Sequence, residues 1–366
     1  MSWRAGALNT EGELGDGTTA TRWQYGDVRA GNDVVQVAAG MAYALALRSG
    51  GTVWAWGSNG HGELGDSTQA ERHTPVQVTG LTGITQVAAG AFFSLALRSD
   101  GTVWAWGDNQ NGQLGRGTVT DHEATPARVA VLNGVTKISA GHDFALALRS
   151  DGIVFAWGHG QRGQLGNGGT ADSSRPVKIA GLSGVTGISA GAEASLATEN
   201  DSLSALTSVW TWGGNDYGEL GDGTLADHRT PERVTGIPAS IAGVSAGTAF
   251  AAVLGTDGSV WDWGANGIGQ LGVAPENSTV TRPVNAFAAG SGITQLSAGG
   301  THVLALKSDG TVLAWGFNQA GQLGHGPIGK TSAGPAPITG LANAAQVSAG
   351  WQSSYAIHTV PYLLGS

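Results

Sequence analysis

The stretch "GTVWAWGSNGHGELGD" at Gly51–Asp66 recurs as "GTVWAWGDNQNGQLGR" at Gly101–Arg116. Paired tryptophans, frequent glycines and few charges are typical of short strands that are joined by tight turns. A phrase that repeats at a fixed interval of this size indicates a solenoid, a propeller or another repeat array. The fold therefore depends on how many copies the chain holds and how they pack.

Two short anchors mark the copies. The first anchor, Gly-Glu/Gln-Leu-Gly, has its leucine at Leu14, Leu64, Leu114, Leu165, Leu220, Leu271 and Leu323. The second anchor, Ala-Gly after a short apolar run, has its glycine at Gly40, Gly90, Gly141, Gly191, Gly247, Gly299 and Gly350. Each anchor occurs seven times at intervals of 50 to 56 residues.

Within one unit the pattern predicts strands. In "QVAAGAFFSLALRSDGTVWAWG" (Gln86–Gly107), large side chains at Phe93, Leu95 and Leu97 alternate with small ones, which is the period of a strand. Asp100-Gly101 supplies the positive φ of a tight hairpin turn. With further strands at "TPVQV" (Thr74–Val78) and at the apolar run before each Ala-Gly, we expect four short strands per unit and no helix.

One four-stranded unit cannot bury both faces of its sheet, but units arranged radially can. We expect an all-β fold in which residues 1–366 form a single seven-bladed β-propeller of four-stranded blades, with an insertion at 199–208 in the fourth unit. An open solenoid is the rival. Because the chain begins and ends within a unit, we expect both termini to share one blade and close the ring.

Paired apolar residues in the third strand of each unit have the right place to fill the wedge between adjacent blades. The pairs are Trp54/Trp56, Trp104/Trp106, Phe155/Trp157, Trp210/Trp212, Trp261/Trp263 and Leu313/Trp315. Each such residue contributes about 1.5–3 kcal/mol when it is buried.

Composition excludes several function classes. The formal net charge of −9 and the lack of basic runs argue against nucleic-acid binding. The chain has no cysteine, so it forms neither a disulfide nor a thiolate zinc site. No signal peptide or membrane-spanning stretch is evident, and we expect a soluble monomer without cofactor or metal. A cytoplasmic location and a secreted one with the leader removed both stay open.

The repeat "WGxNxxGQLGxGT…TPxxVxGLxGVxxVSAGxxxxLALxxDGxV" resembles that of the regulator of chromosome condensation family over nearly the whole chain. The resemblance implies a seven-bladed propeller closed by both termini, and the regular "TPVQVTGLTGITQVAAG" is similar to prokaryotic copies. It implies no single activity, since members include an exchange factor for a nuclear GTPase, a photoreceptor, enzyme inhibitors and interaction domains.

The least repetitive positions follow the two anchors Ala-Gly and Trp-Gly. If Ala-Gly begins the inner strand and Trp-Gly ends its hairpin partner, both lie on the same face of the disc. The positions are Met41, Phe92, His142, Asp143, Glu193, Thr301, Trp351 and Gln352 after Ala-Gly, with Ser58, Asp108, His159 and Phe317 after Trp-Gly. Uniform blades with a varied rim indicate a scaffold with one recognition surface, although neutral drift at exposed positions produces the same pattern.

The leading hypothesis is a binding scaffold whose varied face holds a protein or peptide partner. Phe92, Phe317 and Trp351 are the expected apolar anchors. Asp108, Asp143 and Glu193 are the expected acidic contacts. An alternative is an enzyme on small molecules, in which His142, Asp143 and His159 perform acid–base catalysis at the mouth of a central channel. A third possibility, exchange activity on a GTPase, rests on the family resemblance alone.

Overall fold

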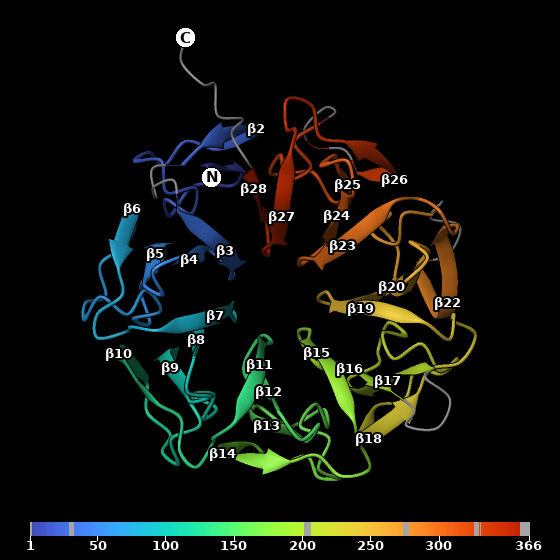
Figure 1. Cartoon of the computed structure of the whole chain (residues 1–366), viewed down its shortest axis with the longest axis horizontal. Coiled ribbons are helices and arrows are strands. Elements are labelled where there is room, and N and C mark those ends of the chain that lie inside the picture. Colours follow the sequence, from blue (N-terminus) through green and yellow to red (C-terminus); the bar gives the residue numbers. More distant parts are fainter. Residues whose placement is uncertain are drawn as a thin grey trace.

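The computed structural model describes residues 2–28, 33–200, 206–273, 278–325, 329 and 331–358, with only the backbone described at 2–5, 7, 27 and 333. This part of the chain forms seven four-stranded antiparallel sheets and contains no helix. The sheets stand as blades around a common centre, with β3, β7, β11, β15, β19, β23 and β27 innermost (Figure 1).

Six blades are each made of four consecutive strands. The first three are β3 (Val34–Ala39), β4 (Tyr43–Arg48), β5 (Val53–Gly57) and β6 (Arg72–Gln77); β7 (Ile84–Ala89), β8 (Phe93–Arg98), β9 (Val103–Asp108) and β10 (His122–Arg128); and β11 (Val135–Ala140), β12 (Phe144–Arg149), β13 (Val154–Gly158) and β14 (Ser173–Lys178). The next three are β15 (Val185–Ala190), β16 (Ala194–Asn200), β17 (Thr207–Gly213) and β18 (His228–Arg233); β19 (Ile241–Ala246), β20 (Phe250–Gly255), β21 (Val260–Ala265) and β22 (Thr279–Phe287); and β23 (Ile293–Ala298), β24 (His302–Lys307), β25 (Val312–Gly316) and β26 (Ser332–Pro337).

The remaining sheet is composite, because it joins strands from both ends of the described chain. Its order is β2-β1-β28-β27, with β1 (Ser2–Ala7), β2 (Arg22–Asp27), β27 (Ala344–Ala349) and β28 (Ser353–His358). β1 pairs with β28 from Ser2 opposite His358 to Ala7 opposite Ser353. The expectation of a seven-bladed propeller therefore needs correction: six blades are continuous copies of the repeat, and the remaining sheet is assembled from strands of both ends of the described chain.

One blade shows how the repeat folds. β8 pairs with β9 so that Phe93 lies opposite Gly107, and the Ser-Asp-Gly turn between them has Gly101 at a φ of +76°. We expected the Ala-Gly anchor to begin the inner strand. It lies instead at the end of the inner strand β7, where the chain turns into β8. Ala-Gly turns and Trp-Gly ends nevertheless share one face of the disc, the mouth face, whereas Ser-Asp-Gly turns occupy the opposite hairpin face.

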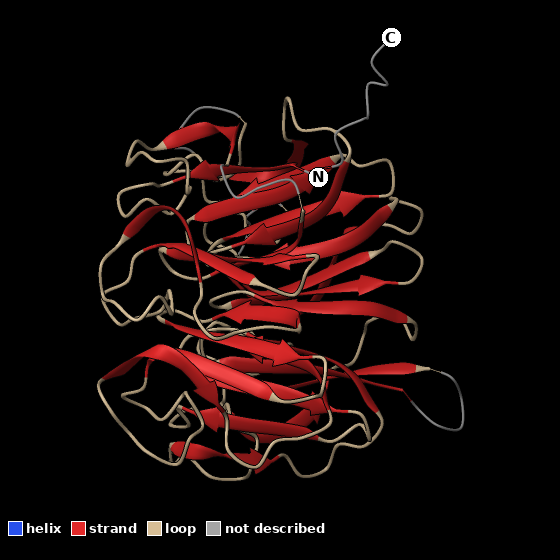
Figure 2. Cartoon of the chain, turned by 60° about the vertical axis from the view of Figure 1, so that its left-hand side comes forward, coloured by secondary structure: helices blue, strands red, loops and turns tan. Residues whose placement is uncertain are grey.

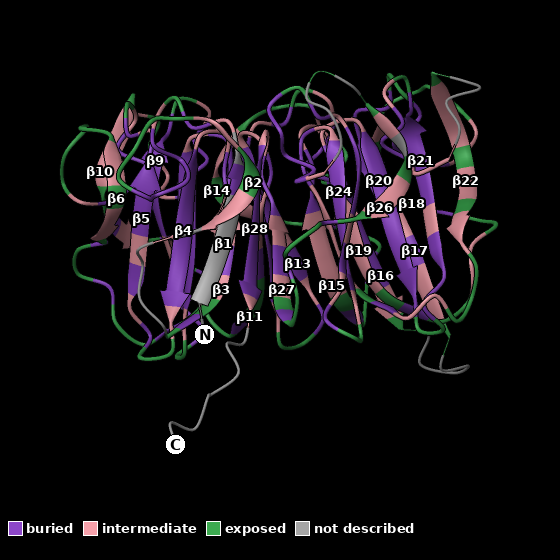
Figure 3. Cartoon of the chain, turned by 90° about the horizontal axis from the view of Figure 1, so that it is seen from above, coloured by how far each residue is buried: buried purple, intermediate pink, exposed green. Residues whose placement is uncertain are grey.

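The hydrophobic core is divided among the junctions, the contact zones between neighbouring blades. At one junction Leu64, Val78 and Leu81 pack against Val87 and Trp106 of the next blade. The strands run through the thickness of the disc and the loops gather at its faces (Figure 2). The two middle strands of each continuous blade are mostly buried, whereas outer strands such as β6 and β18 are intermediate or exposed (Figure 3). Each repeat therefore becomes stable by covering its neighbour.

The second tryptophan of each pair does more than fill the wedge. Its indole N–H donates to the main-chain carbonyl of the Glu or Gln in the preceding unit's Gly-Glu/Gln-Leu-Gly turn, over 2.7 to 3.0 Å. The six pairs are Trp56–Glu13, Trp106–Glu63, Trp157–Gln113, Trp212–Gln164, Trp263–Glu219 and Trp315–Gln270. The indole is thus buried with its polar atom hydrogen-bonded, as is usual for a buried tryptophan.

The composite sheet lacks this tryptophan. In the register of β1 with β28, Gly6 lies where the other blades have the indole. The ring of Tyr25, from the outer strand β2, takes its place, since a Cβ on Gly6 would lie 3.2 Å from that ring and one on Gly324 only 2.7 Å from it. The turn glycine of every other junction faces a tryptophan instead, as Gly65 faces Trp106.

Side chains of the inner strands bind each strand to the next. The amide of Gln36 in β3 accepts a hydrogen bond from Val87 N and donates to Val87 O, both at 3.0 Å. Ser189 in β15 accepts from Ala246 N at 3.0 Å, and Gln346 in β27 accepts from Val37 N at 3.1 Å. Inner strands of neighbouring blades are thus joined by these side-chain bonds and not by a main-chain ladder.

Two irregular stretches extend the pattern. The expected insertion at 199–208 lengthens the β16–β17 hairpin, in which Asn200 pairs with Thr207, and its residues 201–205 lie outside the described part. The tail after His358 also lies outside it. Within the ranges given above, no helix has the length and hydropathy needed to cross a bilayer.

Candidate functional site at the channel mouth

The seven Ala-Gly turns meet at the centre of the mouth face. They line a cavity of about 150 Å³, whose walls include Met41, His142, Thr248 and Trp351. Its floor is almost entirely alanine, glycine and main chain. The repeat therefore gives the cavity a uniform floor, and the residue after each Ala-Gly lines the wall above it.

Crowding explains why glycine ends this anchor. A Cβ on Gly90 would lie 2.1 Å from the Phe93 ring and 2.8 Å from the Gly141 carbonyl oxygen of the next blade. Gly141 and Gly247 are equally confined by Phe144 and Phe250. Any larger residue would push the turns apart, so the small floor is a condition of closing the blades this tightly.

A belt of main-chain hydrogen bonds runs from turn to turn around the mouth. The amide N–H after one Ala-Gly donates to a carbonyl of the next turn, in the pairs Met41–Ala91, Ala91–His142, His142–Gly191, Thr248–Gly300, Gly300–Gly350 and Trp351–Gly40. No such bond links Ala192 to the turn of Gly247 and Thr248, both of which are described. The belt uses up donors and leaves carbonyl lone pairs at the floor, since each carbonyl oxygen has two.

Trp351 and His142 meet over this floor although their turns belong to blades that are not neighbours. Their ring centroids lie 5.8 Å apart at an interplanar angle of 67°. Gly300 makes room for the indole, because a Cβ there would lie 3.2 Å from the Trp351 ring. Both side chains are only partly buried, so the pair forms an accessible aromatic wall at one side of the cavity.

The other expected residues make contacts elsewhere and do not belong to this wall. Phe92 packs against His61 of the preceding blade, with ring centroids 4.8 Å apart. Ser58 donates to the Glu63 carboxylate at 3.0 Å. Asp108 is buried and accepts from Gln113 Nε2 at 2.8 Å. The half-buried Thr301, Phe317 and Gln352 do not line the cavity.

The proposed catalytic trio is only partly assembled. His142 Nδ1 lies 2.8 Å from Asp143 Oδ2, and this hydrogen bond raises the pKa of His142 against the opposing effect of burial. Glu193 and Asp108 raise it further through their charges. His159 belongs elsewhere, because its Nδ1 lies 3.0 Å from Gln164 Nε2 in its own turn.

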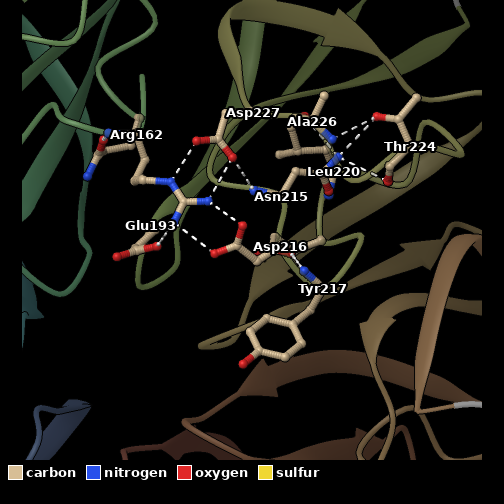
Figure 4. A network of polar contacts seen from close by, with 11 residues as sticks. Arg162, Glu193, Asn215, Asp216, Tyr217, Leu220, Thr224, Ala226 and Asp227 are labelled. Atoms are coloured by element: carbon tan, nitrogen blue, oxygen red, sulfur yellow. Dashed lines mark hydrogen bonds and ion pairs between the residues drawn. The ribbon is translucent and has the colours of Figure 1, made fainter.

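A charged network beside Glu193 was not expected from the sequence (Figure 4). Arg162 of one blade donates to Asp227 at 2.6 and 2.8 Å and to Asp216 at 2.9 Å in the next blade. It also lies 3.3 Å from Glu193. These bonds raise the pKa of Arg162 and lower that of Asp216. Arg162 stands where other turns carry His61, Asn111 or Tyr217, and this departure was the available signal.

Buried titratable groups away from the mouth serve the junctions. His302 is fully buried, its Nε2 lies 2.8 Å from Ser354 Oγ, and burial lowers its pKa to about 4. Among the described residues, no group of three or more His, Cys, Asp or Glu side chains could hold a metal ion.

Comparison with known proteins assigns the repeat. Residues 2–253 match the RCC1-like domain, and residues 257–306 and 309–357 match the regulator of chromosome condensation (RCC1) repeat. The ultraviolet-B receptor UVR8 of Arabidopsis thaliana is 32% identical over 211 residues, which are 57% of this chain and 47% of that protein. Human HERC3, a probable E3 ubiquitin-protein ligase, is 34% identical over 238 residues, 63% of this chain and 22% of that protein. The chain thus spans less than half the length of either relative.

Solved structures share the whole fold. Prp20p of Saccharomyces cerevisiae, reported with its binding to Gsp1p and histones, has a TM-score of 0.85 and 25% identity over 98% of this chain and 92% of that one. Human WBSCR16 has a TM-score of 0.88 and 22% identity over 98% and 99% of the two chains, a likeness of fold alone.

Proposed function

Because the chain belongs to the regulator of chromosome condensation (RCC1) repeat family, we propose that it is an interaction scaffold whose mouth face binds a protein or peptide partner. The observation that carries this proposal is the partly exposed Trp351–His142 wall, which lines a cavity that every blade helps to build. Partly exposed aromatic side chains at the centre of a rigid surface are the residues that dominate binding energy in protein interfaces.

The rigidity of the floor supports the same proposal. Main-chain and side-chain hydrogen bonds tie the inner strands to one another, so little conformational entropy is lost there when a partner binds. Prp20p, a structural relative, is reported to bind the proteins Gsp1p and histones. A protein partner is therefore the simplest use of this face.

A peptide library displayed on phage tests the proposal over many candidate sequences at once. Selected peptides are measured against the wild-type protein and the variants Phe92→Ala, His142→Ala and Trp351→Ala. We expect at least one of these substitutions to weaken binding by about tenfold, which corresponds to about 1.4 kcal/mol. Asp309→Asn, in a Ser-Asp-Gly turn of the hairpin face, is the matched control and leaves binding unchanged. Equal binding to all three mouth variants contradicts the proposal.

An acid–base enzyme remains the second candidate, because the 2.8 Å contact of His142 with Asp143 is the arrangement that orients and activates an imidazole base. His159 takes no part in this version. Exchange activity on a GTPase is a third candidate, supported only by the likeness to Prp20p. Loss of a measured turnover in His142→Gln with unchanged peptide binding would favour the enzyme.

A further inference from the structure

We infer that the cavity at the channel mouth receives one positively charged side chain, an arginine or a lysine, that projects from the bound partner. This inference rests on the proposed function and specifies the chemistry of the partner. Three independent features of the mouth lead to it: the hydrogen-bonding character of the floor, the charge of the rim, and the size and aromatic wall of the cavity.

The floor offers acceptors and few donors. Six of the seven amide N–H groups that follow Ala-Gly are consumed by the belt, the exception being that of Ala192. Each belt carbonyl keeps one lone pair free for a guest. An anionic or carbonyl-bearing guest would find almost no donor here, whereas ammonium and guanidinium groups carry only donors and match the floor.

The rim carries acidic side chains at the turns of His142 and Ala192, the second of which borders the opening in the belt. Asp143 directly follows His142, and Glu193 directly follows Ala192. Arg162 forms ion pairs with Glu193 and also with Asp216 and Asp227. The buried Asp108 adds its charge to the field felt at His142. This part of the rim therefore contains five carboxylates but only one guanidinium and one imidazole. The excess of negative charge attracts a cation and repels an anion.

The size of the cavity selects a side chain rather than a folded segment. A space of about 150 Å³ accepts a group the size of benzene, which is comparable to one guanidinium with part of its stem. Trp351 supplies an aromatic surface at the wall, and cations bind favourably over the face of tryptophan. Met41 lies on the same lining and offers apolar contact to the methylene stem.

Peptides that differ at one position test the inference. The probes are the selected library peptides and three fixed sequences, acetyl-GGRGG-amide, acetyl-GGQGG-amide and acetyl-GGEGG-amide. Binding is followed by nuclear magnetic resonance of indole N–H signals, with Trp351 assigned from the spectrum of Trp351→Phe. We expect the arginine peptide to shift the Trp351 signal at concentrations at least fivefold lower than the glutamine peptide, and the glutamate peptide to bind most weakly.

Charge variants sharpen the result. Asp143→Asn and Glu193→Gln should each weaken binding of the arginine peptide at least threefold, and increasing salt should weaken it in the wild type but less in the variants. Asp309→Asn on the hairpin face serves as control, and thermal melting verifies that each variant is folded. Equal affinity for the arginine, glutamine and glutamate peptides, or unchanged affinity in both charge variants, overturns the inference.

The two proposals can fail separately. If the selected peptides require Trp351 and His142 but contain no arginine or lysine at a fixed position, the mouth is a binding surface and the cation inference is wrong. If their binding does not depend on any mouth residue, both are wrong.

Discussion

Six junctions between blades contain a buried tryptophan, and the junction at Gly324 contains Tyr25 in its place. The six indoles come from the third strand of their own blade and donate to a carbonyl of the preceding one. Tyr25 comes from the outer strand β2, and its buried hydroxyl lies near Ser354 but forms no hydrogen bond of good geometry with the described residues. The two solutions place an aromatic ring over the same turn glycine.

This difference separates two requirements of a junction. The wedge needs the volume of an aromatic ring, whichever strand supplies it, because an empty space between blades forfeits the packing contacts. The hydrogen bond of the indole is an addition that one junction omits. The change in the free energy of unfolding on substitution at a junction should therefore depend first on the volume removed and second on buried polar groups. The following predictions test that order, from the largest effect to the smallest.

Trp106→Ala should lower the free energy of unfolding by about 3–5 kcal/mol, since it leaves a large cavity in a junction that cannot collapse. Urea denaturation measures the change. The control is Trp23→Ala, because Trp23 is 56% exposed and its removal should alter stability by no more than about 0.5 kcal/mol. A loss for Trp106→Ala no greater than that of the control would show that the wedge does not hold the blades together.

Glu219→Gln should change the pH dependence of stability. Burial raises the pKa of Glu219 from 4.5 to about 7, so the folded state binds its proton more tightly than the unfolded state. Stability that is present below pH 4.5 is therefore lost from the wild type as pH rises to about 7, and the difference from the Gln variant reaches about 3 kcal/mol there.

Unfolding measured between pH 4 and pH 8 tests this prediction. The reciprocal control is Gln270→Glu, because Gln270 Oε1 accepts from Ile268 N as Glu219 Oε2 accepts from Tyr217 N. That variant should acquire the same loss of stability at higher pH. Parallel pH profiles for the wild type and Glu219→Gln would contradict the burial effect.

Asp262→Ala should stabilise the protein at neutral pH by about 1–3 kcal/mol, the cost of a buried polar group without a partner. Both carboxyl oxygens of Asp262 lack hydrogen bonds, and burial raises its pKa well above 3.8. The gain should be smallest below pH 3.8, where Asp262 is protonated in the folded and the unfolded state, and should grow as pH rises, because burial opposes ionisation in the folded state.

Thr211→Ala is the matched control for Asp262. Thr211 occupies the corresponding position of another blade, but its hydroxyl donates to Leu220 O at 2.7 Å. Its removal should destabilise the protein by about 1 kcal/mol. Destabilisation by Asp262→Ala would show that the carboxyl makes a favourable interaction in solution.

Tyr25→Phe should raise the free energy of unfolding by about 1 kcal/mol, since the ring stays and the variant lacks a buried hydroxyl that has no well-formed hydrogen bond. Trp106→Phe should instead lower the free energy of unfolding, because it removes both volume and the bond to Glu63 O. Urea denaturation of the two variants compares the two kinds of junction directly. A loss above about 1 kcal/mol for Tyr25→Phe would show that the hydroxyl is bonded and that the two kinds of junction are alike.

The strand pattern was predictable because the period of alternation and the glycine turns are local. Phe93, Leu95 and Leu97 share a face, as expected, and the Ser-Asp-Gly turn lies where Asp100-Gly101 placed it. The resemblance to the regulator of chromosome condensation family is confirmed. The role of Tyr25 was not predictable, because it lies 19 residues from Gly6 and compensates for a missing side chain on another strand.

The candidate site was predictable only as a set of positions. Met41, His142 and Trp351 line one cavity, but sequence could not show that Trp351 reaches His142 across several blades. Nor could it show that His159 bonds to Gln164 instead of joining His142, or that Arg162 draws Asp216 and Asp227 together. Each of these depends on distances between loops of different units.

The sequence by itself determined what every unit shares: the four strands, the hairpin turn, and the small Ala-Gly anchor. These follow from the conformational preferences of residues close together in the chain. Only the tertiary structure decided which residues meet at the mouth and that the belt lacks one hydrogen bond beside Glu193. It also decided that Tyr25 fills the junction of the composite sheet. The reason is that packing one blade against another brings together side chains whose separation along the chain is set by no local preference.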